Sequence, residues 1–358
     1  MSVGRCEGCD EPGAIGAGCS LCGADVRGAI DMGRWRTLAG YGAFAHERDV
    51  PLFVQFSGGR TSGFMTAMSP DHAIVTFQNT GREHEKTLEF VRNVGDALGR
   101  EIVWLEFRPP KAIGDPPKKF LFERVDFRTA NRKGEPFIEF MRSINAYREA
   151  CGNPPIAPWV RGRICTVHLK HRVLDHYVRS LGIHAHDRFI GLRADEPTRV
   201  AGLRRQETRD KGLLAPLYVA GITRETVLEF WQRQSFDLDL PEYDGNCDGC
   251  FLKDQSDISR AVGSSAEKIE WWGWLQDKYP RFGGVTMLNY RDLAAELPTR
   301  LMLEKAFREG RDPVDDGRLT PRRFRLVMIQ EKKRFEHGPN QFSCSCEASM
   351  DPEEEEDQ

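Results

Sequence analysis

The chain has 358 residues, with 51 Lys and Arg against 54 Asp and Glu, so that its formal net charge is −3. This length is ample for one large domain with additions or for two domains. No apolar run approaches the roughly 18 residues that a membrane span requires, and the N-terminus, MSVGRCEGCD, has no apolar stretch of the signal-peptide type. We therefore exclude a transmembrane protein and expect a cytoplasmic protein with no membrane partner.

Acidic residues are concentrated at the C-terminus. The last eight residues hold six of them, and without these six the net charge changes from −3 to +3. We therefore expect a mildly basic body and a disordered segment over residues 341–358, which contains a CxC pair and the acidic tail.

The first 34 residues carry two CxxC pairs nine residues apart, formed by Cys6, Cys9, Cys19 and Cys22. This segment has too few large apolar residues to fold by burial alone. Two CxxC pairs at this spacing suit tetrahedral Zn²⁺, because each pair turns two thiolates towards one ion. We predict a structural zinc knuckle over residues 1–34, with a mononuclear iron centre or free thiols as the alternatives.

A Gly/Ser loop, SGGRTS, follows an apolar strand that is predicted at residues 51–56, and a helix is predicted to start directly after the loop. Glycines let the backbone approach an oxyanion, and the N–H groups of a helix's first turn favour negative charge. The loop matches neither the Walker A sequence nor GxGxxG. The sequence therefore predicts a phosphate-binding loop of another type.

Strands and helices alternate after this loop. Strands are predicted at 73–77, 101–107 and 188–192, and helices at about 83–98, 136–149 and 166–180. Such alternation implies βαβ crossovers and a parallel sheet, whose ligands bind at the carboxyl ends of its strands. The polar segment 193–199 is expected at that edge. Residues 108–135 contain four prolines and are expected to form an irregular insertion.

Four motifs occur in order along the chain: SGGRTS after the first strand, NTG after the second, GLRADEPTR after a later strand, and a CxxC pair beyond it. This order resembles the PP-loop ATP pyrophosphatase superfamily, in its phosphoadenosine-phosphosulfate (PAPS) reductase-like branch, over residues 51–253. The resemblance implies a Rossmann-like (adenine nucleotide alpha hydrolase-like) α/β fold, with a parallel sheet flanked by helices, over residues 48–260. A mostly helical C-terminal region is expected at 261–340.

The resemblance also implies which residues bind the substrate. The SGGxxS loop of this superfamily cradles the phosphates of ATP, which Mg²⁺ bridges, or the phosphate or sulfate of an adenylyl compound. Thr61 departs from the pattern, because many members have Asp there. The implied nucleotide-binding residues are Ser57, Gly58, Gly59, Arg60, Thr61, Ser62, Asn79, Thr80 and Gly81, and those implied at the phosphate or sulfate end of the substrate are Lys170, Arg193 and Arg199.

Cysteines in the body resemble those of the iron–sulfur members of this branch. Cys165 lies 82 residues before Cys247, which opens a CxxC pair with Cys250, and this separation resembles the [4Fe–4S] arrangement of the adenylyl-sulfate reductases. Three thiolates can hold a cubane cluster and a fourth ligand completes it. Cys151 is the expected fourth ligand. The alternatives are an open iron, a ligand from the C-terminal CxC pair, or zinc in place of the cluster.

The resemblance implies an enzyme that binds ATP or an adenylyl compound and carries out adenylation-coupled sulfur transfer, similar to the sulfurtransferases of DNA phosphorothioation and tRNA thiolation. A first alternative is a reductase of adenylyl sulfate or phosphoadenylyl sulfate that releases sulfite, for which Cys344 and Cys346 are the candidate catalytic thiols. A second alternative is a non-catalytic module that senses nucleotides. No motif identifies the sulfur donor or reductant protein.

A zinc knuckle fused to a mildly basic body makes a nucleic acid a candidate substrate. His168, His171 and His176 lie on the helix predicted at 166–180, where we expect a solvated basic face, with a metal triad as the alternative. The basic residues that are candidates for a phosphate track are Arg161, Arg163, Lys170, Arg172, Arg179, Arg199, Arg204, Arg205, Arg209 and Lys211.

Overall fold

The structure is a computed structural model of the chain. It describes residues 3–5, 12–14, 30–32, 35, 42–158, 164–204, 207, 210–245, 247–251, 253–279 and 289–337. The expected zinc ligands lie outside the described residues, as do the CxC pair and the acidic tail: Cys6, Cys9, Cys19, Cys22, Cys344 and Cys346. The zinc knuckle and the C-terminal thiols therefore stay predictions.

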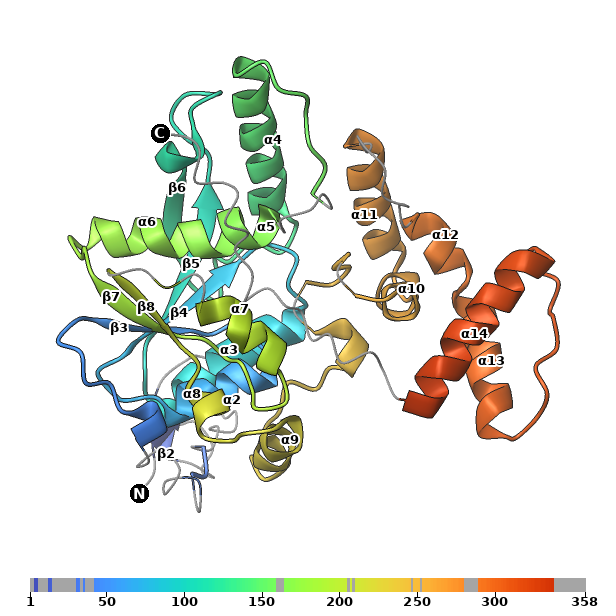
Figure 1. Cartoon of the computed structure of the whole chain (residues 1–358), viewed down its shortest axis with the longest axis horizontal. Coiled ribbons are helices and arrows are strands. Elements are labelled where there is room, and N and C mark those ends of the chain that lie inside the picture. Colours follow the sequence, from blue (N-terminus) through green and yellow to red (C-terminus); the bar gives the residue numbers. More distant parts are fainter. Residues whose placement is uncertain are drawn as a thin grey trace.

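A six-stranded sheet lies at the centre of the fold (Figure 1). Its order is β6-β5-β4-β3-β7-β8, and every neighbouring pair is parallel except β5 and β6. From β3 the chain adds β4 and β5 on one side and later β7 and β8 on the other, as in Rossmann-like folds. The predicted α/β class with a mostly parallel sheet is confirmed. The strands are β3 (Leu52–Gln55), β4 (Ile74–Asn79), β5 (Ile102–Arg108), β6 (Leu121–Val125), β7 (His186–Phe189) and β8 (Lys211–Leu214).

Helices cover both faces of this sheet, as a parallel sheet requires. The helices on one face are α2 (Arg60–Met68), α3 (Glu85–Leu98), α8 (Pro216–Val219) and α9 (Arg224–Gln232). Those on the other face are α4 (Glu135–Ala150) and a continuous run of α5 (Ile164–Thr166), the π-helical turn η3 (Val167–His171) and α6 (Arg172–Ser180). The remaining short elements are β1 (Val3–Arg5), β2 (Pro12–Ala14), α7 (Pro197–Arg204), η1 (Gly42–Phe44), η2 (Pro117–Lys119) and η4 (Glu242–Asp244).

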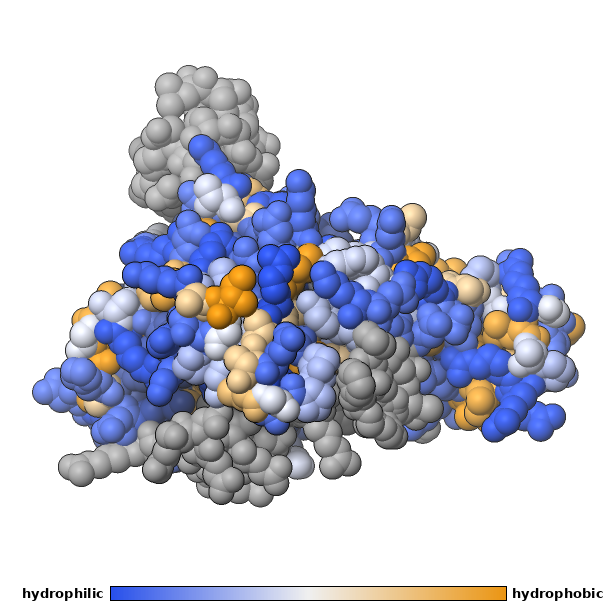
Figure 2. Space-filling model, turned by 90° about the horizontal axis from the view of Figure 1, so that it is seen from above, coloured by the Kyte–Doolittle hydropathy of each residue, from blue (hydrophilic) through white to orange (hydrophobic). Residues whose placement is uncertain are grey.

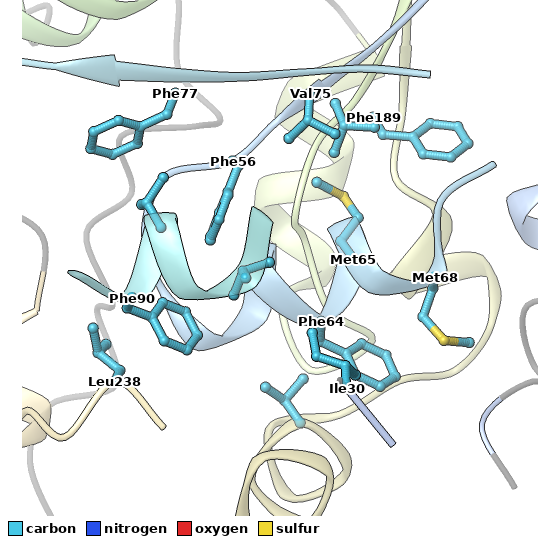
Figure 3. Packing of buried hydrophobic residues seen from close by; sticks show 14 of the residues in the cluster. Ile30, Phe56, Phe64, Met65, Met68, Val75, Phe77, Phe90, Phe189 and Leu238 are labelled. Carbon is cyan, nitrogen blue, oxygen red and sulfur yellow. The ribbon is translucent and has the colours of Figure 1, made fainter. Parts of the chain in front are cut away.

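The hydrophobic core has two main parts, one on each face of the sheet. Alternate residues of β3 face opposite parts, so Val54 joins the first part and Phe53 the second. This explains why the strand is a continuous apolar run rather than an alternating one. Figure 3 shows the first part, in which Met65 of α2 points towards Val75 and Phe189 of the sheet.

The C-terminal part of the described chain is helical, as predicted. Trp272 connects it to the sheet domain by packing edge-on against Phe137 of α4, at 6.2 Å between ring centroids. Inside it, Arg300 lies 2.7 Å from Glu331, and Arg260 contacts the same carboxylate. These buried ion pairs fix the helices relative to one another. The helices are α10 (Gln255–Gly263), α11 (Ala266–Lys278), α12 (Tyr290–Ala295), α13 (Leu297–Arg308) and α14 (Pro321–His337).

The outer surface carries mostly hydrophilic side chains. On the face seen in Figure 2, hydrophobic residues form small separate patches. Among the described residues, none of the helices combines the length and the apolar composition that crossing a bilayer demands.

Two strands of the sheet were not predicted. β6 lies within residues 108–135, where an irregular insertion was expected, so this part of the prediction is wrong. β6 is an antiparallel edge strand whose residues are mostly exposed or half-buried, and it therefore lacks the apolar signature of a central strand. β8 is only four residues long and includes a glycine.

The position predicted for β7 was wrong by several residues. A strand was expected at 188–192, whereas the structure has it at His186–Phe189. Its first residues are polar, yet they are buried, because Asp187 accepts a hydrogen bond from His46 at 2.9 Å and Arg188 pairs with Asp175. Buried polar side chains need such partners, and hydropathy alone does not reveal them.

Candidate nucleotide and thiol site

The predicted loops meet at the carboxyl edge of the sheet. β3 lies between β4 and β7, and the connections from these strands leave in opposite directions. This is a topological switch point, where open α/β sheets bind their ligands. The SGGRTS loop follows β3, and residues 193–199 follow β7, so the structure brings these two motifs to the same crevice.

The loop has the geometry of an anion cradle. Gly58 has φ +80°, and a Cβ there would lie 2.5 Å from Thr87 Cγ2, so the position requires glycine. Ser62 Oγ accepts a hydrogen bond from Ser57 N at 3.1 Å and lies 2.9 Å from Ser57 Oγ, which ties the loop ends together. In the described part of the chain, no side chain caps the N-terminus of α2 at Gly59. The first-turn N–H groups of α2 are therefore donors suited to a phosphate.

Arg193 places positive charge beside this cradle. Its Nη1 donates to Thr61 Oγ1 at 3.2 Å, while Nε and Nη2 donate to Asp195 at 3.0 and 2.9 Å. Burial opposes the charged form, but the hydrogen bonds that Arg193 donates to Asp195 and the charge of Glu196 outweigh it and raise the pKa of Arg193. A fixed, buried guanidinium therefore lies beside the loop, and the substrate-binding role of Arg193 stays a prediction.

The side chains of Arg199 and Arg60 both pair with carboxylates of the protein. Arg199 contacts Glu196, and its Nε is buried with no hydrogen-bond partner in the described residues. Arg60 directs its guanidinium to Asp237, with Nε–Oδ1 at 2.7 Å, and its carbonyl accepts from Trp231 Nε1 at 2.8 Å. Arg60 thus offers the loop a backbone N–H, while its side chain is held on Asp237.

The NTG motif forms a tight turn after β4. Asn79 Nδ2 donates to Glu106 Oε1 at 2.6 Å, and Asn79 Oδ1 accepts from Gly81 N at 3.1 Å. Thr80 donates from its N–H to Glu83 at 2.8 Å, and Lys170 Nζ lies 3.9 Å from Glu83. Asn79 and Thr80 therefore shape the wall beside the loop through side-chain contacts within the protein.

Cys250 acts electrostatically on both Cys165 and Cys247. Burial, and then the charge of Cys250, raise the pKa of Cys165 to about 12. Burial, with the charges of Asp248 and Cys250, holds the pKa of Cys247 well above its usual range. Cys151 is exposed at the C-terminal end of α4. The structure therefore groups Cys165, Cys247 and Cys250.

The three thiols could bind a metal group only as thiolates. Within the described ranges, no three His, Cys, Asp or Glu side chains lie close enough together to hold one metal ion. A bound cation would lower the pKa of these thiols and stabilise their thiolate forms.

Sequence reasoning missed several residues of this edge. Glu83, Arg82, Asp248 and Lys253 are all buried there, yet none was named as a site residue, although Asp248 lies within the CxxC pair of Cys247 and Cys250. The π-helical turn η3, which follows Cys165, is a second signal, since such turns are frequent at functional sites. No local pattern in the sequence indicates it.

The expected solvated histidine face is wrong. His168 is 2% exposed and stacks on Phe140 at 5.1 Å, and His171 is 5% exposed, with its Nδ1 3.5 Å from Gln55 Nε2. The face of η3 and α6 that carries these two histidines packs on the sheet. Of the ten basic residues, Arg161, Arg163, Arg205 and Arg209 lie outside the described residues, and Lys170 and Arg199 face carboxylates.

The buried His168 and His171 should make the folded state less stable in acid. Burial lowers the pKa of His168 and of His171 to about 3, from 6.5 in an exposed side chain. The unfolded state therefore binds more protons, so stability is complete above pH 6.5 and falls as the pH drops towards 3. Each histidine lowers the free energy of unfolding by about 2 kcal/mol at pH 5 relative to pH 8.

Urea unfolding at pH 8 and pH 5 measures this loss. His171→Asn keeps a polar partner for Gln55 but does not titrate, so it should remove about half of the acid-dependent loss that the two histidines cause. An unchanged pH dependence in His171→Asn would contradict the assignment.

The structure is that of an α/β protein with a Gly/Ser loop at the switch point of its sheet. No protein-family model matches the chain. A curated protein of Escherichia phage lambda, the uncharacterized nin region protein ORF290, is 30% identical over 215 residues, which cover 58% of this chain and 68% of the phage protein. The chain belongs to the same family as this phage protein.

Two solved structures show weaker similarity. Phosphoadenylyl-sulfate (PAPS) reductase from Candida auris, in a phosphate complex, is 14% identical, with 56% of this chain and 75% of that chain covered and a TM-score of 0.28. The U34-tRNA thiolase NcsA from Methanococcus maripaludis, with its [4Fe-4S] cluster, is 11% identical, with 94% and 90% covered and a TM-score of 0.31. These scores are low, so the fold assignment rests on the strand order and the loop.

Proposed function

We propose that the chain is a PP-loop enzyme of the PAPS reductase-like type that binds ATP, or another adenylyl nucleotide, and uses it for sulfur transfer. The observation that carries this proposal is the anion cradle at residues 57–62, with the buried Arg193 beside it. Preorganised N–H donors and a fixed guanidinium stabilise the negative charge of a departing pyrophosphate.

The proposed reaction has two displacements. An oxygen of the acceptor attacks the α-phosphorus of ATP, and pyrophosphate leaves into the cradle. A sulfur nucleophile then attacks the acceptor atom that carries this oxygen, and AMP leaves with the oxygen. Mg²⁺ would bridge the phosphates of ATP, although Thr61 offers a hydroxyl where many members of the superfamily offer a carboxylate.

The thiols Cys165, Cys247 and Cys250 would hold a [4Fe–4S] cluster on the same edge of the sheet. When bound, such a cluster would supply an iron that takes up inorganic sulfide for transfer. The chain's own contribution is to bury Cys250 and to place Lys170 near Cys165, where its charge partly opposes the rise in the pKa of Cys165 that burial causes. Cys151, exposed at the C-terminal end of α4, would not belong to this set, and a cluster held by these three thiols would take its fourth ligand from elsewhere.

Nucleotide titrations of the anaerobically purified full chain test this proposal. ATP is expected to bind with an affinity that falls when Mg²⁺ is removed. Adenylyl sulfate offered with a dithiol should release no sulfite. Sulfite release would instead favour the reductase, and failure of both nucleotides to bind would contradict the proposal. A steep salt dependence of binding to a mixed RNA or DNA pool would support a nucleic-acid acceptor.

A further inference from the structure

Helix α14 lies at the end of the molecule that is farthest from the sheet (Figure 1). It packs on α13 and on α10. Phe324 and Val327 of α14 are buried in one cluster with Leu303 of α13, and they hold one face of the helix inward. The opposite face of α14 is therefore turned towards the solvent.

Charged side chains on the inward side of α14 are paired with the rest of the helical region. Arg323 and Arg334 each contact a carboxylate that lies outside α14. Glu331, which is 2% exposed, accepts a hydrogen bond from Arg300 Nη1 at 2.7 Å. These pairs satisfy the buried charges and fix the orientation of the helix.

The outward face of α14 is basic. Side chains at spacings of three, four and seven residues share one face of a helix, and the exposed basic side chains at such spacings are Arg322, Arg325, Lys332 and Lys333. We call this set the basic stripe, which extends about 16 Å along the helix at 1.5 Å per residue. Lys332 lies 3.9 Å from Glu336 of the same helix. In the described part of the chain, no carboxylate pairs with Arg322, Arg325 or Lys333.

A row of unpaired cations on a rigid helix suits the backbone of a nucleic acid. Each strand of a duplex presents one phosphate per roughly 3.4 Å of axis, so about five phosphates lie along the length of the basic stripe. A guanidinium binds a phosphate through two parallel N–H donors. The charge and the spacing of the stripe therefore match a polyanion with regularly placed phosphates.

The apolar residues within the stripe are too few for an apolar partner. Leu326 and Ile329 are 46% and 56% exposed. A helix that docks in a protein groove presents apolar side chains at i, i+3, i+4 and i+7, but the position seven residues after Leu326 is Lys333. A helix that lies in a membrane interface needs a continuous apolar face. The apolar part of this face is one turn long, which favours phosphates over either alternative.

We propose that the outward face of α14 is a docking surface for the sugar–phosphate backbone of a nucleic acid, which it binds through Arg322, Arg325 and Lys333. Because α14 lies at the end of the molecule farthest from the sheet (Figure 1), the surface holds a long polymer at a point remote from the crevice. The inference goes beyond the proposed function and does not depend on it, since docking at α14 requires no ATP.

The test measures binding of the full chain, without ATP, to a short fluorescent DNA duplex and to an RNA hairpin over a range of KCl concentrations. Wild-type affinity should fall steeply with salt, because phosphate contacts release counterions. The triple variant Arg322→Gln, Arg325→Gln, Lys333→Gln should bind about tenfold more weakly at about 0.1 M KCl. The slope of log Kd against log salt should fall by about 2–3, close to one for each lost phosphate contact.

The triple variant Lys111→Gln, Lys118→Gln, Arg128→Gln is the matched control. These three residues are exposed around β6 in the sheet domain, and their replacement changes the net charge by the same amount. The control should keep the wild-type slope. Circular dichroism checks that each variant folds, and the single change Arg325→Glu, which should also lower the slope by about 1 or more, replaces the α14 triple variant if that one does not fold.

Two kinds of result would overturn the inference. One is an unchanged slope in a folded α14 variant, or an equal loss in the control, which would leave only the overall charge as the cause. The other is tighter binding of polyglutamate or of anionic lipid vesicles than of both nucleic acids at equal charge concentration, which would assign the surface to an acidic protein or to a membrane. A protein with the expected salt dependence that binds no ATP would contradict the proposed function alone.

Discussion

Gly58→Ala is expected to weaken ATP binding by about tenfold to a hundredfold, which corresponds to about 1.4–2.8 kcal/mol. The added Cβ would lie 2.5 Å from Thr87 Cγ2 and 3.3 Å from Phe77, and φ is +80°. Because Thr87 and Phe77 lie in the core, the loop itself must move, and the N–H groups of the cradle then lose their alignment. The measurement is calorimetric titration with ATP, together with chemical unfolding.

Gly99→Ala separates the effect of backbone strain at a positive φ from the effect of the clash with Thr87. Gly99 also has a positive φ, +62°, but a Cβ there would meet nothing within 4 Å. It should cost only the backbone strain of about 1–2 kcal/mol in stability and leave ATP affinity unchanged. Equal ATP affinity in Gly58→Ala and the wild type would contradict the placement of the phosphates at this loop.

Cys250→Ser is expected to abolish iron binding, whereas Cys151→Ser should retain it. Cys250 is buried and its charge acts on both Cys165 and Cys247, so its loss removes the central member of the set. Serine is nearly the same size but a poor ligand for a soft cluster. Iron and acid-labile sulfide, measured on anaerobically purified protein, should be about four of each per chain in the wild type and in Cys151→Ser.

Two outcomes would contradict this partition of the cysteines. Retention of iron in Cys250→Ser would place the cluster elsewhere or exclude it. Loss of iron in Cys151→Ser would make this exposed thiol the fourth ligand, and the loop that follows α4 would then have to close over the site. Unfolding is monitored by circular dichroism, so that loss of iron is not confused with loss of structure.

Local sequence patterns were sufficient to predict the central part of the fold. The apolar run before SGGRTS, the glycines and the following helix are contiguous in sequence, and the structure has β3, the loop and α2 in that order. Alternation of strands and helices then implied a parallel sheet, and parallel strands bring their carboxyl-end loops to one edge. The position of the candidate site follows from that rule alone.

Features that depend on distant partners were not predictable in this way. β7 begins with His186, Asp187 and Arg188, and the two charged residues are buried with partners from other parts of the chain: Asp187 pairs with Arg48 and Arg188 with Asp175. The same holds for Arg82 and Asp248, which are 166 residues apart in sequence. A charged residue is predicted to be exposed unless its partner is known. The ion pair between Arg82 and Asp248 is therefore visible only in three dimensions.

We propose that one edge of the sheet holds both an adenine nucleotide and an iron–sulfur cluster. The most direct measurement is anomalous diffraction at the iron edge from crystals of anaerobically purified protein grown with a non-hydrolysable ATP analogue. We expect phosphate density against the N–H groups of residues 57–62 and an iron peak bounded by Cys165, Cys247 and Cys250. Nucleotide bound away from this loop, or three unliganded thiols, would contradict it.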